Sequence, residues 1–366
     1  MKHRLLIIVL FASASLLFAQ GARQSPPDAI GRSAVDANGR TVSLKAAVGD
    51  LLIAGKAGNM PANALFLFPE VVSMHLTLPK TDQGLGDFFA LIRPELDQHS
   101  RISQSASVEE IATRAADLVL MKATHYESTA KKLDQLGVPN FTMSLETWAQ
   151  WQDELVQLGN LLGNPGRAQE VLALYNRRLN LVNERAAQRS VNQKKRVLLL
   201  QADRIDNTTS YKIAPDSWMQ TWMVEQAGAQ PVWKGANKAS SGWSTVSFEQ
   251  IAAWDPDLIV IISYSTPSAS FLEGIYASPT WRELRAVQDG EVFASPHDLM
   301  NYIQPVASWI VGLQWLAKTI YPASYRDLVI ADEVESFYRD FYAIDDPTII
   351  ATLVDSYLAS VQQNRR

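Results

Sequence analysis

The segment 164-NPGRAQEVLALYNRRLNLVNERAAQR-189 decides the fold, because it predicts one long helix between two similar halves of the chain. Asn164 is a favourable N-cap, and Pro165 suits the first helical position, where its missing N–H costs nothing. Apolar residues recur at helical spacing, at Val171, Leu174, Tyr175, Leu179, Val182 and Ala186. At 1.5 Å per residue the helix would extend roughly 37 Å. An ordinary core helix is the alternative, and the flanking sequence favours a helix that braces both halves.

Two segments on either side of this helix match each other without a gap. They are 107-SVEEIATRAADLVL-120 and 247-SFEQIAAWDPDLIV-260. In each, a serine begins a short helix, an acid or amide three residues later completes a capping box, and an aspartate opens an apolar strand. The echo predicts two related lobes.

Strands and helices alternate in both halves, which predicts an α/β protein with mainly parallel sheets. We therefore expect two Rossmann-like lobes joined by one long α-helix. Residues 23–163 form the N-terminal lobe, 164–190 the interdomain helix, and 191–366 the C-terminal lobe with closing helices.

The first residues predict a secretory signal at 1–22. Lys2 and Arg4 precede an apolar run that is too short to span a membrane, and small residues follow it. Removing this segment lowers the 33 basic residues to 31 against 38 acidic ones, a net charge of −7, which excludes nucleic acid as a partner. The chain has no cysteine, which suits an oxidising compartment. We expect a soluble periplasmic monomer.

Loops at the carboxyl ends of strands are common ligand positions in α/β sheets, and several hold aromatic or polar residues. The candidate ligand-binding residues are Asn59, Met60, His125, Tyr126, Tyr211, Trp218, Trp243, Tyr264, His297 and Tyr302. Trp and Tyr offer flat faces and polar tips that suit a macrocycle or an aromatic siderophore, although an aromatic residue taken singly is more often part of the core. Ser240-Ser241-Gly242 and Thr209-Ser210 could instead bind a small oxyanion.

His125 and His297 could ligate iron or serve structural roles. The histidines after residue 22 are scattered, so no metal site is assigned.

Glu109 and Glu249 occupy equivalent places in the two echoing segments. A glutamate in the first turn of a helix is favoured by the helix dipole alone. The alternative is a pair of acidic docking points, one per lobe, for a two-fold partner.

These features are similar to a known family. The chain resembles the periplasmic substrate-binding proteins of ABC importers for iron complexes and cobalamin, the class III type with one rigid interdomain helix. The resemblance rests on 36-DANGRTV-42, both echoing segments, 281-WRELRAVQDGEV-292 and the tail from Trp309 to Pro322. It implies that Glu109 and Glu249 dock on arginines of a permease dimer in the inner membrane. The segment 334-VESFYRDFY-342 resembles the branch with iron-complex and molybdate/tungstate binders.

The expected function is capture of a metal complex, such as an iron-siderophore, haem or corrinoid, between the lobes. A small oxyanion is the alternative ligand. A tetrapyrrole metal chelatase using His125 and Glu127 is the competing enzyme. The chain has neither a Gly-x-Ser-x-Gly elbow nor a His-Glu-x-x-His motif, so we expect a carrier with no cofactor and no catalytic residues.

Overall fold

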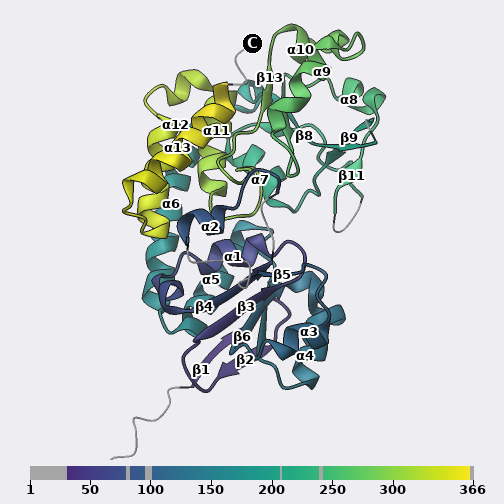
Figure 1. Ribbon diagram of the computed structural model, residues 1–366. Helices are drawn as coiled ribbons and strands as arrows, with labels where there is room; N and C mark the ends of the chain where they lie inside the picture. Colours follow the sequence, from purple (N-terminus) through teal and green to yellow (C-terminus); the bar gives the residue numbers. More distant parts are fainter. Residues whose placement is uncertain (1–30, 80–82, 95–100, 207, 239–241, 363–366) are drawn as a thin grey trace, which may run out of the picture.

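Two α/β lobes lie one above the other in the computed structural model (Figure 1). The structure describes residues 31–79, 83–94, 101–206, 208–238 and 242–362. The predicted signal at 1–22 and the residues Ser240-Ser241 lie outside these ranges. The α/β class with two sheets is confirmed.

The N-terminal lobe is built on a five-stranded parallel sheet in the order β5-β4-β3-β6-β7. Its strands are β3 (Asp50–Ala54), β4 (His75–Pro79), β5 (Arg101–Ile102), β6 (Leu118–Lys122) and β7 (Asn140–Met143). β3 and β6 lie side by side as buried apolar runs, as a parallel sheet covered on both faces requires. A separate hairpin, β1 (Arg32–Val35) and β2 (Thr41–Leu44), turns at Gly39, whose φ of +75° fits the Asn-Gly turn.

The C-terminal lobe has a six-stranded mixed sheet in the order β11-β9-β8-β12-β13, with β10 also paired to β8. Its strands are β8 (Arg196–Ile205), β9 (Thr208–Ile213), β10 (Gln230–Pro231), β11 (Ser244–Thr245), β12 (Leu258–Ile262) and β13 (Val292–Ala294). β8, β12 and β13 are parallel, whereas β9 and β11 extend the sheet in antiparallel fashion.

Helices cover both sheets. The first lobe has α1 (Asn59–Leu65), α2 (Phe88–Ile92), α3 (Val108–Thr113), α4 (Lys131–Gln135) and α5 (Trp148–Leu162). The second has α7 (Met219–Gln226), α8 (Phe248–Trp254), α9 (Leu272–Ala277), α10 (Arg285–Gln288), α11 (Trp309–Ile320), α12 (Ile330–Tyr342) and α13 (Pro347–Gln362). In the described part of the chain, no helix is long and apolar enough to cross a membrane.

The predicted long helix is α6 (Pro165–Ala187), which runs along one side of both lobes (Figure 1). The side chain of Asn164 accepts a hydrogen bond from the backbone N–H of Arg167 at 3.0 Å, so the helix begins as the sequence indicates. α6 packs against α5 of the first lobe and against α11 and α12 of the second.

Tyr175, in the middle of α6, is the point where these helices meet. Its ring stacks on Trp309 of α11, with centroids 5.1 Å apart and planes 3° from parallel. It also contacts Trp148 of α5 at 5.5 Å and Phe341 of α12 at 4.6 Å. Its hydroxyl donates to the carbonyl of Ala307 at 2.7 Å. One fully buried side chain therefore contacts both lobes.

The closing helix α12 belongs to the C-terminal lobe in sequence, but it also contacts the first lobe. The hydroxyl of Tyr342 donates to Asn63 Oδ1 of α1 at 2.6 Å, and Arg167 donates to the carbonyl of Phe341 at 2.6 Å. Phe88 of α2 lies against the rings of Tyr338 and Tyr342. The lobes are thus joined by a second set of contacts beside α6.

The two echoing helices are capped less fully than the sequence predicts. Ser107 accepts from the N–H of Glu110 at 3.1 Å, and Ser247 accepts from that of Gln250 at 3.3 Å. The return bonds from the Glu110 and Gln250 side chains, which would complete the capping boxes, do not form. Both residues are exposed, so water can solvate the polar groups at these helix ends.

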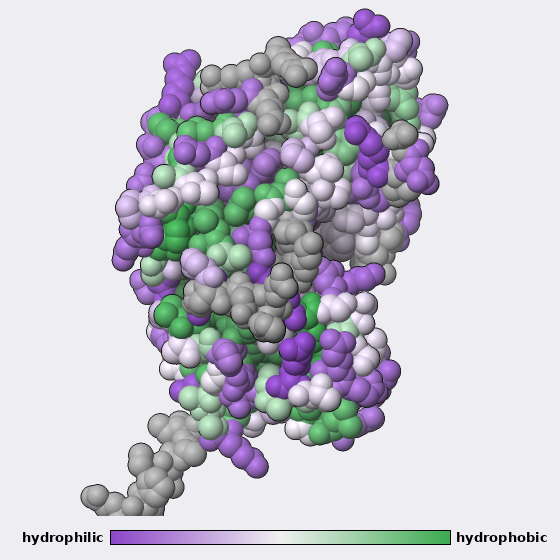
Figure 2. All heavy atoms as spheres, in the orientation of Figure 1, coloured by the Kyte–Doolittle hydropathy of each residue, from purple (hydrophilic) through white to green (hydrophobic). Residues whose placement is uncertain are grey.

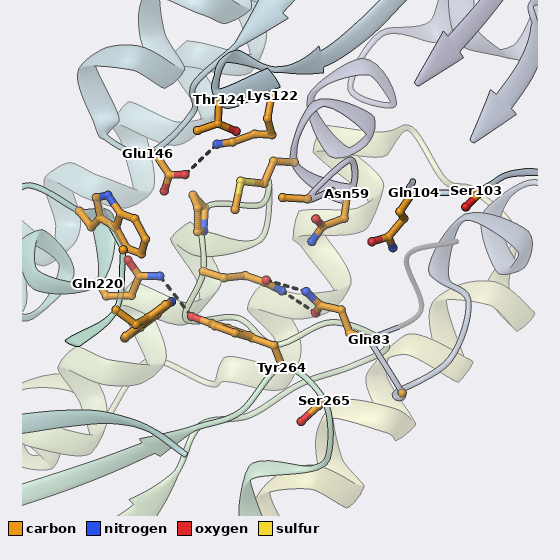
Figure 3. Close-up of a pocket in the computed structure, with 18 of the residues that line it drawn as sticks. Asn59, Gln83, Ser103, Gln104, Lys122, Thr124, Glu146, Gln220, Tyr264 and Ser265 are labelled. Carbon is orange, nitrogen blue, oxygen red and sulfur yellow. Dashed lines mark hydrogen bonds and ion pairs between the residues drawn. The ribbon is translucent and has the colours of Figure 1, made fainter. Parts of the chain in front are cut away.

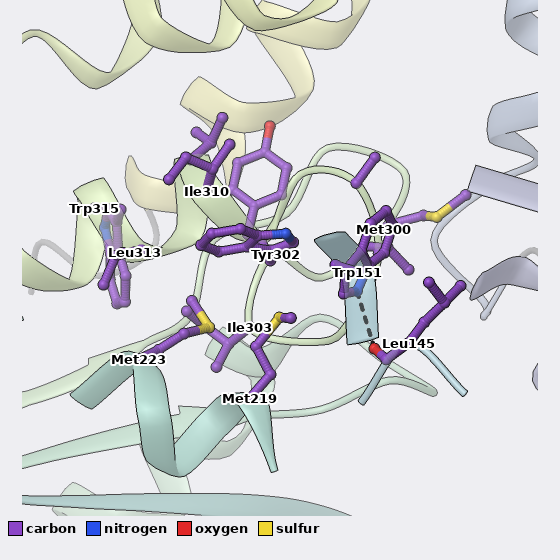
Figure 4. Packing of buried hydrophobic residues seen from close by; sticks show 14 of the residues in the cluster. Leu145, Trp151, Met219, Met223, Met300, Tyr302, Ile303, Ile310, Leu313 and Trp315 are labelled. Atoms are coloured by element: carbon purple, nitrogen blue, oxygen red, sulfur yellow. Dashed lines mark hydrogen bonds between the residues drawn. The ribbon is translucent and has the colours of Figure 1, made fainter. Parts of the chain in front are cut away.

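Large side chains fill the interior of the second lobe around α7 and α11. Figure 4 shows Met219 and Met223 of α7 facing Ile303 and Leu313 across this core.

In the first lobe, Trp151 of α5 is also fully buried, and its indole N–H donates to the carbonyl of Leu145 at 2.9 Å. The loop that leaves β7 is thereby held against the core.

Glu154 of α5 is a buried carboxyl that holds the same loop. Its Oε2 accepts the backbone N–H groups of Ser144 at 2.8 Å and Leu145 at 3.1 Å. Burial raises the pKa of Glu154 to about 8, although these two donors and the nearby Lys122 act in the opposite direction.

Replacing Glu154 with glutamine should change how stability depends on pH. An unfolded glutamate ionises near pH 4.5, whereas folded Glu154 keeps its proton up to about pH 8. Between these values the folded state binds more protons, so the free energy of unfolding falls as pH rises. Glu154→Gln should lack this fall in the free energy of unfolding, which amounts to at most about 1.4 kcal/mol per pH unit. Urea unfolding at several pH values across the window measures it.

Asp153→Asn is the control, because Asp153 is the exposed neighbour of Glu154. It should largely keep the wild-type pH dependence. Parallel curves for wild type and Glu154→Gln would contradict the assignment.

Candidate ligand-binding site

A cavity of about 1140 Å³ lies between the two lobes. In the space-filling view the molecule narrows between them (Figure 2). The cavity is lined by Ala57, Asn59, Met60, Gln83, Gly84, Ile102, Ser103, Gln104, Lys122, Thr124 and Glu146 of the first lobe. The second lobe contributes Trp218, Gln220, Gly242, Trp243, Tyr264, Ser265, Gln304 and Pro305.

The first-lobe residues all lie at or after the carboxyl ends of parallel strands. Asn59 and Met60 follow β3, Gln83 follows β4, and Gln104 follows β5. Lys122 ends β6, and Glu146 follows β7. Because these ends meet at one edge of the sheet, residues far apart in the sequence form one wall (Figure 3).

Aromatic side chains form much of the second-lobe wall. Trp218 and Trp243 meet edge to face at 5.7 Å, and Trp243 lies 6.1 Å from Tyr264. The hydroxyl of Tyr264 donates to the carbonyl of Ile303 at 2.9 Å and accepts from Gln220 Nε2 at 3.2 Å. Burial raises the pKa of Tyr264, so the phenol stays protonated.

Carboxamides line the cavity on both sides. Gln83 and Gln304 pair across the lobes, each donating its Nε2 to the other's Oε1 at 3.0 Å (Figure 3). Asn59 Nδ2 and Gln220 Oε1 are buried and have no hydrogen-bond partner among the described residues. An unpaired buried amide atom is costly, so both atoms suit contacts to a polar ligand.

The charged groups among the described lining residues form a pair. Lys122 Nζ lies 2.8 Å from Glu146 Oε1, and it also donates to the carbonyl of Ser144 (Figure 3). Lys122 is only 3 % exposed, so its charge is compensated inside the wall.

The structure brings five of the ten candidate ligand residues to this cavity. They are Asn59, Met60, Trp218, Trp243 and Tyr264.

His125 and Tyr126 lie elsewhere in the first lobe. His125 lines a separate cavity of about 200 Å³, and its Nε2 lies 3.2 Å from the carbonyl of Lys56. Tyr126 packs on the smaller core cluster of this lobe, beneath the guanidinium of Arg40 at 5.1 Å.

Tyr211, His297 and Tyr302 have structural contacts in the second lobe. Tyr211 packs on Trp281 at 4.9 Å, and burial raises its pKa to about 12. His297 Nδ1 lies 2.7 Å from the carbonyl of Asp298. Tyr302 is fully buried, and its hydroxyl donates to Asp298 Oδ2 at 3.0 Å. All three lie outside the lining of the interlobe cavity.

The sequence-based search missed Gln83, Gln104, Lys122, Glu146 and Gln304. The strand-end rule that selected Asn59 also covers the last residue of β6 and the residues after β4, β5 and β7, so it would have found four of them. The signal in the sequence was the end of every parallel strand of the first lobe, and not only of β3. Gln304 follows no strand, and only the fold brings it to Gln83.

No group of three or more His, Asp or Glu side chains is arranged to hold a metal ion anywhere in the described ranges.

Glu109 of α3 and Glu249 of α8 are both exposed, and both helices lie on the side of the molecule opposite α6 (Figure 1). Hydrogen bonds from their own backbone N–H groups, and then from the capping serines, lower the pKa of both carboxyls. Helices α3 and α8 thus each present an ionised glutamate in the first turn.

The chain is similar to several known proteins in sequence. It is 26% identical over 286 residues to the molybdate-binding protein MolA of Haemophilus influenzae, covering 70% of this chain and 76% of that protein. It is 19% identical over 216 residues to the Fe(3+)-citrate-binding protein YfmC of Bacillus subtilis, covering 59% of this chain and 64% of that protein.

The fold is similar to solved structures. A periplasmic solute binding protein from Veillonella parvula superposes with a TM-score of 0.71 at 20% identity, over 92% of this chain and 99% of that one. MolA bound to molybdate superposes with a TM-score of 0.70 at 18% identity, over 86% and 98%. The model of the family described as periplasmic binding protein matches residues 75–299, well over half of the sequence. The chain therefore belongs to the periplasmic binding protein family.

Proposed function

We propose that the chain is the periplasmic solute-binding component of an ABC importer and binds a metal complex in the interlobe cavity. Family membership supports the binding role, and the cavity lined by both lobes is the observation that supports this site. Residues 1–22 would direct export and be removed, leaving lobes 23–163 and 191–366 joined by helix 164–190. The protein would act as a monomer that delivers cargo to a permease dimer.

Size and chemistry favour a complex with an organic shell. A volume of about 1140 Å³ suits a ligand of at least drug size, since such pockets usually measure roughly 300–1000 Å³. The Trp and Tyr faces suit an apolar or conjugated ring, and the carboxamides suit polar groups at its edge. Iron-siderophores, haem and corrinoids all combine these features.

A small oxyanion is the second candidate, because the relative MolA is a molybdate-binding protein. Asn59 Nδ2 supplies an unpaired donor for such a ligand. Against it, the one cation among the described lining residues, Lys122, is already paired with Glu146.

A chelatase is less well supported. Glu127 is exposed and bonded to Lys131 at 3.0 Å, and His125 lies in the smaller cavity, so neither lines the space that would hold a tetrapyrrole. We propose a carrier with no catalytic residues.

Binding is tested with a panel of ferrichrome, ferric enterobactin, ferric citrate, haem, cyanocobalamin and molybdate. We expect one of the metal chelates to bind stoichiometrically and to quench tryptophan fluorescence, because Trp218 and Trp243 line the cavity. Trp243→Ala should weaken binding of that chelate at least tenfold, since burying a large apolar side chain contributes about 1.5–3 kcal/mol. Calorimetry measures the affinity.

Trp254→Ala is the matched control, because Trp254 is a partly buried tryptophan of α8 outside the cavity lining. It should keep the wild-type affinity. Binding of molybdate alone would favour the oxyanion, and metal insertion into a porphyrin would favour the chelatase.

Docking on the permease is tested with Glu109→Ala combined with Glu249→Ala. Both carboxylates are exposed and far from the ligand wall, so ligand affinity should be unchanged while uptake through the cognate permease is lost. The pair Glu110→Ala and Gln250→Ala changes the next exposed residue on each helix and should leave uptake intact. Equal uptake by all three proteins would remove the docking assignment.

Lobe closure on binding should be only a few degrees. α6 has no break at which backbone angles could change, and α12 adds contacts of Tyr342 with Asn63 and Phe88 between the lobes. Small-angle scattering should therefore give nearly the same radius of gyration with and without the bound chelate. A marked compaction on binding would contradict the prediction that α6 holds the two lobes nearly rigid.

A further inference from the structure

Lys122 and Glu146 form an ion pair in the cavity wall that the fold builds into the first lobe. Lys122 is the last residue of β6, and Glu146 follows β7, the neighbouring strand. Their side chains meet at 2.8 Å, and the ammonium also donates to the carbonyl of Ser144. The Glu146 side chain remains 23% exposed, so a ligand in the cavity can approach it.

Glu146 is held in this position by the ion pair of its side chain with Lys122 and by hydrogen bonds to both sides of its backbone. Its N–H donates to Gln150 Oε1 at 2.9 Å. Its carbonyl accepts from the N–H of Met219, at the start of α7 in the other lobe, at 2.9 Å. The preceding residue, Leu145, is held by Glu154 and Trp151. The acid is therefore a fixed part of the wall.

The remaining described lining residues are neutral, being carboxamides, hydroxyls, aromatic rings and small or apolar groups. The field of Glu146 also reaches the opposite wall, where it adds to the effect of burial in raising the pKa of Tyr264. The wall thus holds one acid and one base that cancel. An anionic ligand would meet a carboxylate and a cation that already has its counter-ion.

We propose that Glu146 determines the charge selectivity of the cavity. By neutralising Lys122, it makes the site selective for chelates without net charge and disfavours anionic ones. This inference rests on the proposed function, since it names the class of metal complex that the same cavity takes.

The size of the effect follows from Coulomb's law. One carboxylate about 6 Å from a multiply charged anion changes its affinity at least about tenfold, even when water screens the pair. Removing the Glu146 charge also leaves the Lys122 ammonium without its carboxylate partner. The wall then carries one net positive charge instead of none, which favours an anion and leaves an uncharged chelate nearly unaffected.

The experiment compares Glu146→Gln with wild type, using two ferric chelates. Ferrichrome is uncharged, because three hydroxamates balance Fe³⁺, whereas ferric enterobactin carries three negative charges. We expect Glu146→Gln to bind ferric enterobactin at least about tenfold more tightly and ferrichrome within about threefold of wild type. The gain should shrink as NaCl is raised, because salt screens charges.

Glu225→Gln is the control for total charge. It removes the carboxylate of a surface ion pair, Glu225 with Lys234 at 2.5 Å, outside the cavity lining. It should bind both chelates as wild type does. Adding Lys122→Met to Glu146→Gln should remove the gain, because the unpaired ammonium is then absent.

An unchanged ratio of the two affinities in folded Glu146→Gln would overturn the inference. Should that variant fail to fold, wild type alone decides, because it must prefer ferrichrome to ferric enterobactin and the reverse order overturns the inference. Failure of the proposed function has a different signature, in which wild type binds no chelate of the panel at all.

Discussion

The buried ring of Tyr175 is the contact on which the arrangement of the two lobes depends. It stacks on Trp309 and lies against Trp148 and Phe341, so three helices, taken from both lobes, pack around one side chain of α6. Its hydroxyl is satisfied by the carbonyl of Ala307, so this polar atom is buried at little cost. Close packing of this kind resists small rotations, because any shift of one lobe opens gaps around the ring. The cavity between the lobes therefore keeps a fixed geometry.

The cavity combines two kinds of wall because the lobes present different elements to it. The first lobe presents the carboxyl ends of parallel strands, whose short loops place amides and the Lys122–Glu146 pair at one edge. The second presents the N-cap of α7, the residue before β11 and the loop after β12, which supply Trp218, Trp243 and Tyr264. A ligand held between them would contact polar groups on one side and flat apolar faces on the other.

The fold was largely predictable from the sequence, because its signals are local. Asn164 and Pro165 mark the start of α6, and the serine-led echo marks one helix and one strand in each lobe. Part of the cavity lining was predictable, most directly where a residue follows an obvious strand, as Asn59 does. His125 follows β6 but lies in a different cavity beside Lys56, and Tyr302 is drawn into the core by Asp298. Orientation of this kind depends on tertiary contacts that a single sequence does not contain.

The backbone at Leu145 has a consequence for how this protein could change during evolution. Its φ of +55° is unfavourable for a residue with a side chain, and that side chain is nevertheless fully buried. Glycine would relieve the backbone but empty part of the core, while other residues would keep the strain and lose the fit. The segment beside Glu146 is therefore poorly tolerant of mutation. New cargo preferences would arise more readily on the loops after β4 and β5, where Gln83 and Ser103 are only partly buried or exposed.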